Sequence, residues 1–384
     1  MSKKQAGFAT RSIHVGNEPD PSTGAVAPPI FATSTYAQEE LGKTKGYDYS
    51  RAGNPTRTRL EQNLASLERG VASRVFSSGM AAVAALANLM KAGEHIVASN
   101  NLYGGVPRLF NQVLANFGLE FTYVDTSDPR NVTKAIRKST RFVYIETPTN
   151  PLMGLTDIAA VSEIAHKRGC QVVVDNTFMT PYFQQPIELG ADMVLHSTTK
   201  FLNGHSDGIG GVLVCTTADQ AEKLAFVQKA VGAILSPFEC WLVLRGVKTL
   251  AVRMKQHDQS GRVIADYLSH HRKVKKVFYP GLESHPQYEL ACRQMSGFGS
   301  MITFETGSLA NAKKFLKRVR VCTLGESLGG VETLISHPAT MTHAAIGAAG
   351  RKAIGLTDGM VRISVGIEEV EDLIADLDQA LTAI

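Results

Sequence analysis

Short apolar runs, separated by stretches long enough for a helix, fill the first half of this 384-residue chain. They are His95–Ala98, Phe121–Val124, Phe142–Ile145, Val172–Val174, Met193–Leu195 and Val212–Cys215. Runs without polar alternation are typical of strands that are covered on both faces, and long connections suit crossover helices. We therefore expect an α/β fold built on a mostly parallel sheet with helices on both faces.

The pattern changes on either side of this region. Residues 1–50 are rich in proline and glycine and show little periodicity, which predicts an arm without a core of its own. Residues 51–248 form the predicted large domain, and residues 249–384 form a smaller α+β domain. The segments expected in and around the second domain are a long helical pattern at Phe238–His271, strands at Val274–Tyr279, Ser300–Phe304, Val321–Leu324 and Val361–Ser364, and a closing helix at Glu369–Leu381.

Composition excludes several classes of function. A hydrophobic share of 44% and a charged share of 20% are typical of a globular protein. The net charge is +5, but the basic residues are scattered, which favours small anionic ligands over nucleic acid. The five cysteines are widely spaced without a CxxC pair, so we expect a reducing compartment and neither a disulfide nor a metal framework. No apolar run approaches the ~20 residues of a membrane span, and the cytoplasm is the expected location.

Lys200 and Asp175 are the residues most suggestive of chemistry. Lys200 follows an apolar run and three hydroxyl residues, Ser197, Thr198 and Thr199, which suits an amine held as an imine beside a bound phosphate. Asp175 ends the preceding run and could pair with a ring nitrogen, as pyridoxal phosphate requires. Alone, such a lysine is most often a surface charge and such an aspartate a turn or cap. Together, at strand ends of one α/β region, they favour a shared site.

Several motifs occur in one order along the chain. They are Tyr49–Arg57, Ser78–Met80, Tyr103–Gly105, Glu146–Pro151, Asp175–Phe178, His196–Lys200 with Asn203–Asp207, and Glu326–Gly330. From Phe8 to the C-terminus they resemble the Cys/Met-metabolism branch of fold-type I pyridoxal-phosphate enzymes, among which cystathionine γ-synthases and γ-lyases are the most similar members. The resemblance implies pyridoxal 5'-phosphate as cofactor and small amino acids as substrates. It also implies a homotetramer, a dimer of dimers with shared active sites.

The resemblance assigns cofactor roles residue by residue. Lys200 would hold the cofactor aldehyde and then move protons, while Asp175 would keep the ring nitrogen protonated. Tyr103 would stack on the ring and assist proton transfer. The residues that would bind the phosphate are Gly79, Met80, Ser197 and Thr199 from the same chain, and Tyr49 and Arg51 from the arm of the neighbouring subunit.

Substrate roles follow from the same resemblance. Arg362 would grip the α-carboxylate with a bidentate fork, with Asn150 and Ser327 beside it. Three charged residues would bind the far end of a long substrate. They are the acid Asp48, the base Arg108 and the acid Glu326.

The sequence indicates the family more clearly than it indicates the reaction. Asp48 and the run Ser336–Thr342 favour a cystathionine γ-synthase, which joins an O-acylhomoserine to cysteine by γ-replacement. A γ-lyase, which releases 2-oxobutanoate and ammonia from cystathionine and can release hydrogen sulfide from cysteine, is the alternative. Methionine γ-lyases, which carry a cysteine two or three residues after the stacking tyrosine and an apolar residue before the serine of Ser-Leu-Gly, are disfavoured by Gly105, Val106 and Glu326. Typical enterobacterial-type cystathionine β-lyases, which carry an aromatic residue at the position of Glu326, are disfavoured for the same reason. An aminotransferase and a non-enzymatic relative are further alternatives, and the homoserine ester stays open.

Overall fold

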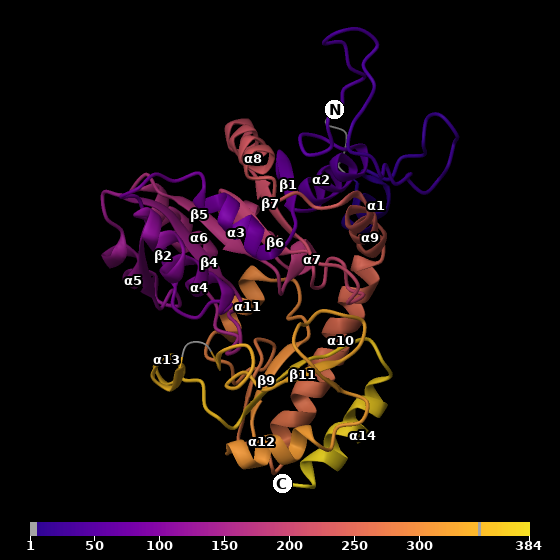
Figure 1. The fold of residues 1–384 in the computed structure, drawn as a ribbon. Coiled ribbons are helices and arrows are strands. Elements are labelled where there is room, and N and C mark those ends of the chain that lie inside the picture. Colours follow the sequence, from indigo (N-terminus) through magenta and orange to yellow (C-terminus); the bar gives the residue numbers. More distant parts are fainter. Residues whose placement is uncertain (1–5, 345–346) are drawn as a thin grey trace.

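The computed structural model describes residues 6–344 and 347–384 and contains two β-sheets (Figure 1). The larger sheet has seven strands in the order β1-β7-β6-β5-β4-β2-β3. Its strands are β1 (Ala72–Phe76), β2 (His95–Ser99), β3 (Glu120–Val124), β4 (Thr140–Glu146), β5 (Gln171–Asp175), β6 (Met193–Ser197) and β7 (Gly211–Cys215). Strands β2 to β6 are parallel, whereas β7 is antiparallel to both β1 and β6. The predicted mostly parallel sheet is confirmed.

Helices cover both faces of this sheet. They are α2 (Pro55–Leu67), α3 (Gly79–Ala87), α4 (Gly105–Gln112), α5 (Pro129–Ala135), α6 (Ile158–His166), α7 (Thr180–Phe183), α8 (Ala218–Val231) and α9 (Pro237–Val247), with 3-10 turns η1 (Leu114–Phe117) and η2 (Pro186–Leu189). Alternate residues of β4 show the two-sided core. Phe142 and Tyr144 pack with residues of α3 and α4, whereas Val143 and Ile145 pack with residues of α5 and α6. Burial on both faces is why these strands lack polar alternation.

The second sheet has five strands in the order β10-β11-β12-β9-β8. The strands are β8 (Lys276–Phe278), β9 (Met301–Glu305), β10 (Thr323–Leu324), β11 (Leu334–Ser336) and β12 (Met360–Ser364). The helices of this part are α10 (Leu250–His270), α11 (Tyr288–Gln294), α12 (Leu309–Leu316), α13 (Gly347–Ala353) and α14 (Val370–Leu381), and α10 packs against β8, β9 and α14. The predicted helical stretch 238–271 is two helices, because α9 ends at Val247 and α10 begins at Leu250.

The N-terminal arm is only partly as expected. Its first part forms α1 (Phe8–His14), which packs against α2 and α10, although the sequence shows little periodicity there. Arg11 and Ser12 of this helix are buried.

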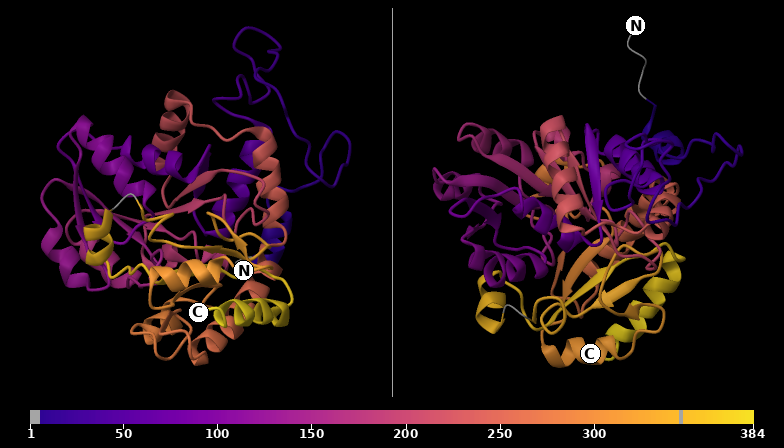
Figure 2. Two further views of the ribbon diagram at one scale, coloured as in Figure 1. Left: turned by 60° about the horizontal axis from the view of Figure 1, so that its bottom comes forward. Right: turned by 45° about the horizontal axis from the view of Figure 1, so that its top comes forward.

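The loops between α1 and α2 project from the rest of the chain (Figures 1 and 2). Among the described residues, no helix has the length and apolar character required to cross a membrane.

Candidate active site

A cavity of about 390 Å³ lies where β4, β5 and β6 end. In a parallel α/β sheet this carboxyl edge is where ligands bind. The residues at the ends of β4 and β5, Glu146 and Asp175, are register partners on adjacent strands. The predicted site residues that line the cavity are Gly79, Met80, Tyr103, Asn150, Asp175, Ser197, Thr199, Lys200, Glu326, Ser327 and Arg362.

Lys200 lies in the turn that follows β6, and its Nζ donates a hydrogen bond to Ser327 Oγ at 2.7 Å. Burial, with a smaller contribution from the charge of Arg362, lowers the pKa of Lys200 to about 8. About a tenth of the amine is therefore uncharged near neutral pH. An uncharged amine is the form that attacks a carbonyl carbon.

Asp175 is held by its own turn. Its Oδ1 accepts the N–H of Thr177 at 3.1 Å and the hydroxyl of Thr177 at 2.5 Å. Burial raises the pKa of Asp175, and no salt bridge within the described part of the chain compensates it. A cation beside this carboxylate would oppose that shift, and a protonated ring nitrogen of a ligand is such a cation.

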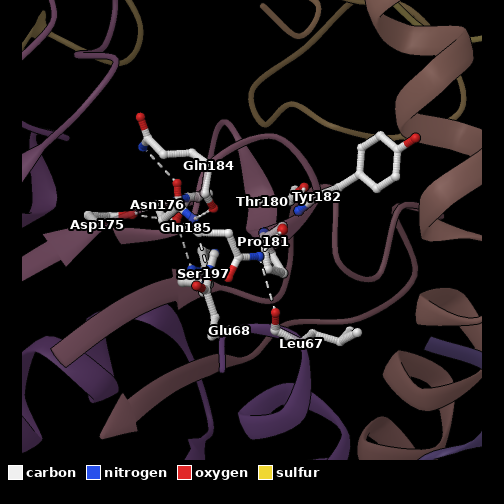
Figure 3. Close-up of polar contacts among 12 residues, drawn as sticks. Leu67, Glu68, Asp175, Asn176, Thr180, Pro181, Tyr182, Gln184, Gln185 and Ser197 are labelled. Carbon is white, nitrogen blue, oxygen red and sulfur yellow. Dashed lines mark hydrogen bonds and ion pairs between the residues drawn. The ribbon is translucent and has the colours of Figure 1, made fainter. Parts of the chain in front are cut away.

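The ends of β5 and β6 are tied together behind the site (Figure 3). Glu68, directly after α2, accepts hydrogen bonds from His196 Nε2 at 2.5 Å and from Asn176 Nδ2 at 3.0 Å. Asn176 also exchanges hydrogen bonds with Gln184, both through side-chain and backbone atoms. Because Asn176 follows Asp175 and His196 precedes Ser197, this buried network fixes the spacing between the two strand ends that carry the site.

Arg362 on β12 brings the second sheet to the cavity. Its Nη1 donates to Asn150 Oδ1 at 3.0 Å and its Nη2 donates to the carbonyl oxygen of Ser327 at 2.8 Å. Only 2% of Arg362 is exposed, and its Nε has no hydrogen-bond partner among the described residues. Burial lowers its pKa to about 10. A buried guanidinium without a carboxylate partner is a site for an anion.

The N-terminus of α3 offers a second anion site. Ser78 caps this nine-residue helix, and its Oγ accepts the N–H of Ala81 at 3.0 Å. The N–H groups of Gly79 and Met80 lie in the first turn, where a helix has no internal acceptors, so they are available to a phosphate. A Cβ at Gly79 would lie 3.1 Å from Ser197 Cβ, so the glycine lets the helix approach β6.

Four predicted site residues do not line the cavity of the single chain. Tyr49 is 46% exposed in the arm, and Arg51 Nη1 donates to the carbonyl oxygen of Lys229 at 2.6 Å. Asp48 is exposed beside Tyr49, and Arg108 is exposed on α4. One chain therefore brings together eleven of the predicted residues and leaves these four apart.

Some cavity residues had no predicted role. They are Ser78, Val83, Val106, Glu146, Pro148, Thr177, Phe178, Leu195, Ile209, Leu328 and Thr342. Glu146 could have been found, because it ends an apolar run immediately before that of Asp175, and neighbouring parallel strands end at the same edge.

Residues 9–382 match the family model described as "Cys/Met metabolism PLP-dependent enzyme". The chain belongs to this family. Three relatives of known name are similar over nearly their whole length: a cystathionine γ-lyase of Bacillus subtilis (50% identical, covering 98% of this chain and 99% of the relative), a cystathionine β-lyase of Coxiella burnetii (49%, 99% and 99%) and a cystathionine γ-synthase of Mycobacterium bovis (47%, 98% and 97%). The chain is almost equally identical to enzymes with three different named activities. The comparisons therefore show a transsulfuration enzyme, but they do not select one of the three reactions.

Two solved structures share the fold. One, described as metB from Corynebacterium glutamicum, has a TM-score of 0.96 and 47% identity over 98% of each chain. The other, a cystathionine γ-lyase from Lactobacillus plantarum complexed with L-serine, has a TM-score of 0.97 and 45% identity over 99% of each chain. The α/β fold of this enzyme family is thus shown.

The family depends on pyridoxal phosphate, and the residues of this chain fit that group. The amine of Lys200 matches the aldehyde, and the carboxylate of Asp175, which lacks a cation, matches the ring nitrogen. The first turn of α3 matches the phosphate. All three line one cavity, and its volume of about 390 Å³ lies within the range of small-molecule sites.

Proposed function

We propose that this enzyme is a cystathionine γ-synthase, which replaces the γ-substituent of an activated homoserine with the thiol of cysteine. The observation that carries the proposal is one cavity that joins Lys200, Asp175 and Arg362 to an acid, Glu326, at its rim. The first three residues suit an amino acid on pyridoxal phosphate, and the acid suits the ammonium group of an incoming cysteine. Thr342, from the run that resembles synthases, also lines the cavity.

Each residue has a distinct task in this proposal. When bound, pyridoxal phosphate supplies an electron sink for the pair left when a proton leaves Cα. Lys200 Nζ takes that proton and returns protons to the substrate carbons, because its lowered pKa lets it alternate between base and acid near neutral pH. Arg362 and Asn150 hold the substrate carboxylate, and Tyr103 covers the ring face.

We also propose that the active site is completed by a second copy of the chain. Tyr49 and Arg51 lie outside the cavity of their own chain, and loops between α1 and α2 project from the body (Figure 2). In this proposal the arm, residues 1–50, and the adjoining Arg51 reach the phosphate site of a partner subunit, and two such dimers form the homotetramer. Residues 51–248 and 249–384 are the two domains that enclose each cavity.

Replacing Arg362 by lysine is expected to raise KM for the amino-acid substrate about tenfold to a hundredfold, because a point charge replaces a planar fork. The turnover number should change much less than KM. Steady-state kinetics checks this, with Arg130→Lys on the exposed surface as the matched control. An unchanged KM in Arg362→Lys would contradict the assigned carboxylate grip.

Replacing Glu326 by valine is expected to change substrate preference while cofactor affinity stays the same. Glu326 is exposed at the rim, so the loss for cysteine or cystathionine relative to methionine should be about fivefold, the scale of one exposed charge pair. The ratios of kcat/KM for the three substrates and a cofactor titration measure the two effects. Identical preferences before and after the change would refute this role of Glu326.

The lowered pKa of Lys200 predicts how cofactor-free enzyme captures pyridoxal phosphate. Below the pKa of about 8 the uncharged amine increases about tenfold per pH unit, and above it the increase levels off. The capture rate, corrected for the titration of the cofactor itself by the rate of Nα-acetyl-lysine per uncharged amine, should follow this curve. A corrected rate that keeps rising to pH 10 would show an ordinary lysine pKa.

A cystathionine γ-lyase is the second candidate, favoured by the 50% identity to the Bacillus subtilis enzyme of that name. The purified enzyme should be offered the acetyl, succinyl and phospho esters of homoserine, each with and without cysteine, and then cystathionine alone. We expect cystathionine from one ester with cysteine. No cystathionine from any ester, together with 2-oxobutanoate from cystathionine, would replace the synthase assignment by the lyase. Pyruvate and homocysteine from cystathionine would assign a β-lyase.

A further inference from the structure

We propose that Glu146 is a positioning residue that ties the ring-covering tyrosine to the substrate-carboxylate site. Glu146 ends β4, is 5% exposed and lines the cavity. The identity of these two sites, as ring-covering and carboxylate-binding, rests on the proposed function. The new element is that Glu146 fixes their relative positions.

One carboxylate holds two loops from different parts of the chain. Oε2 of Glu146 accepts the backbone N–H of Tyr103 at 2.8 Å, and Oε1 accepts the backbone N–H of Asn150 at 3.2 Å. Tyr103 lies just before α4, whereas Asn150 lies in the loop after β4. The carboxylate therefore fixes the distance between these two backbones.

Asn150 also connects Glu146 to the guanidinium of Arg362, which binds the substrate in the proposed function. Asn150 Oδ1 accepts the hydrogen bond from Arg362 Nη1 at 3.0 Å, and the carbonyl oxygen of Asn150 contacts His343 Nε2 at 3.1 Å. Glu146, Asn150 and Arg362 thus form a continuous path across the cavity. A displacement of the Asn150 backbone would move an acceptor of Arg362 directly.

An acid with two acceptor oxygens satisfies this arrangement. A carboxylate accepts at both oxygens, whereas an amide offers one acceptor and one donor, so glutamine would place N–H against a backbone N–H. The acid is costly here, because burial and the neighbouring charge of Asp175 raise the pKa of Glu146 well above its usual value. The two backbone donors and the charge of Arg362 oppose that shift.

The test is Glu146→Gln in the cofactor-loaded enzyme, with rates divided by bound cofactor. We expect KM for the amino-acid substrate to rise about tenfold, the effect of a lost hydrogen bond to a charged group, while kcat changes less than threefold. The visible circular dichroism of the bound cofactor should also change, because Tyr103 is released. Glu163→Gln, an exposed acid on α6, is the matched control and should leave all three quantities unchanged.

A double-variant cycle with Arg362→Lys separates positioning from general damage. If Glu146 acts through Asn150 and Arg362, Glu146→Gln should raise KM less than twofold in the Arg362→Lys background. Additive effects, an unchanged KM, or a loss confined to kcat would overturn the proposal. If Glu146→Gln does not fold, Glu146→Asp keeps both acceptors but withdraws them by one methylene, and the same outcomes apply. Wild-type turnover, measured first, tests the proposed function independently.

Discussion

Replacing Lys200 by alanine is expected to lower turnover by about 10²–10⁴-fold, the range for loss of a positioned acid–base group. Lys200 is the amine in the cavity that contacts Ser327, and its lowered pKa suits both attack on an aldehyde and proton transfer. The visible absorbance of the bound cofactor should shift to that of the free aldehyde, because the covalent bond to the chain is lost. Activity and absorbance spectra measure the two effects.

The control for this experiment is Lys223→Ala, which removes an exposed lysine of α8 that pairs with Asp219. That variant should keep the wild-type rate and spectrum. If Lys200→Ala retained turnover within about tenfold of wild type, a group other than Lys200 would have to move the protons, and the assignment would fail.

Replacing Asp175 by alanine is expected to lower turnover by about 10²–10³-fold, the scale for loss of a group that stabilises developing charge. Without the carboxylate, the ring nitrogen loses the partner that keeps it protonated, and the electron sink weakens. Cofactor retention should also fall. Glu68 contacts Asn176 and His196 without the Asp175 carboxylate, so the fold should persist.

Circular dichroism in the far ultraviolet and a cofactor titration separate these effects for Asp175→Ala. Asp219→Ala, an exposed carboxylate on α8, is the matched control. A folded Asp175→Ala enzyme with near-normal turnover and cofactor affinity would reject the role of Asp175.

The strands of the large sheet could be predicted because their burial is two-sided. β4 and β5 are covered on both faces, so their sequences are continuous apolar runs. The antiparallel direction of β7 could not be predicted, since an apolar run such as 212–215 has no direction. β11, with three residues, is too short for a periodic pattern, and the helix break before Leu250 follows no proline.

The candidate site could be predicted in part for the same reason. Asp175 and Lys200 follow buried strands, so their common edge follows from the parallel order. Arg362 reaches the cavity from the second sheet. Local sequence patterns do not predict where that sheet lies relative to the cavity, so only the family resemblance indicated a role for Arg362. The place of Glu146 follows from the strand ends, but its role depends on backbone N–H groups of two loops, which carry no side-chain pattern.

The central claim is that Lys200 Nζ holds pyridoxal phosphate covalently. The most direct measurement is borohydride reduction of the freshly purified, cofactor-loaded enzyme, followed by proteolysis and mass mapping of the labelled peptide. We predict one phosphopyridoxyl group per chain, on Lys200. A label on another lysine, or an enzyme that stays unlabelled after reconstitution with the cofactor, would contradict the account.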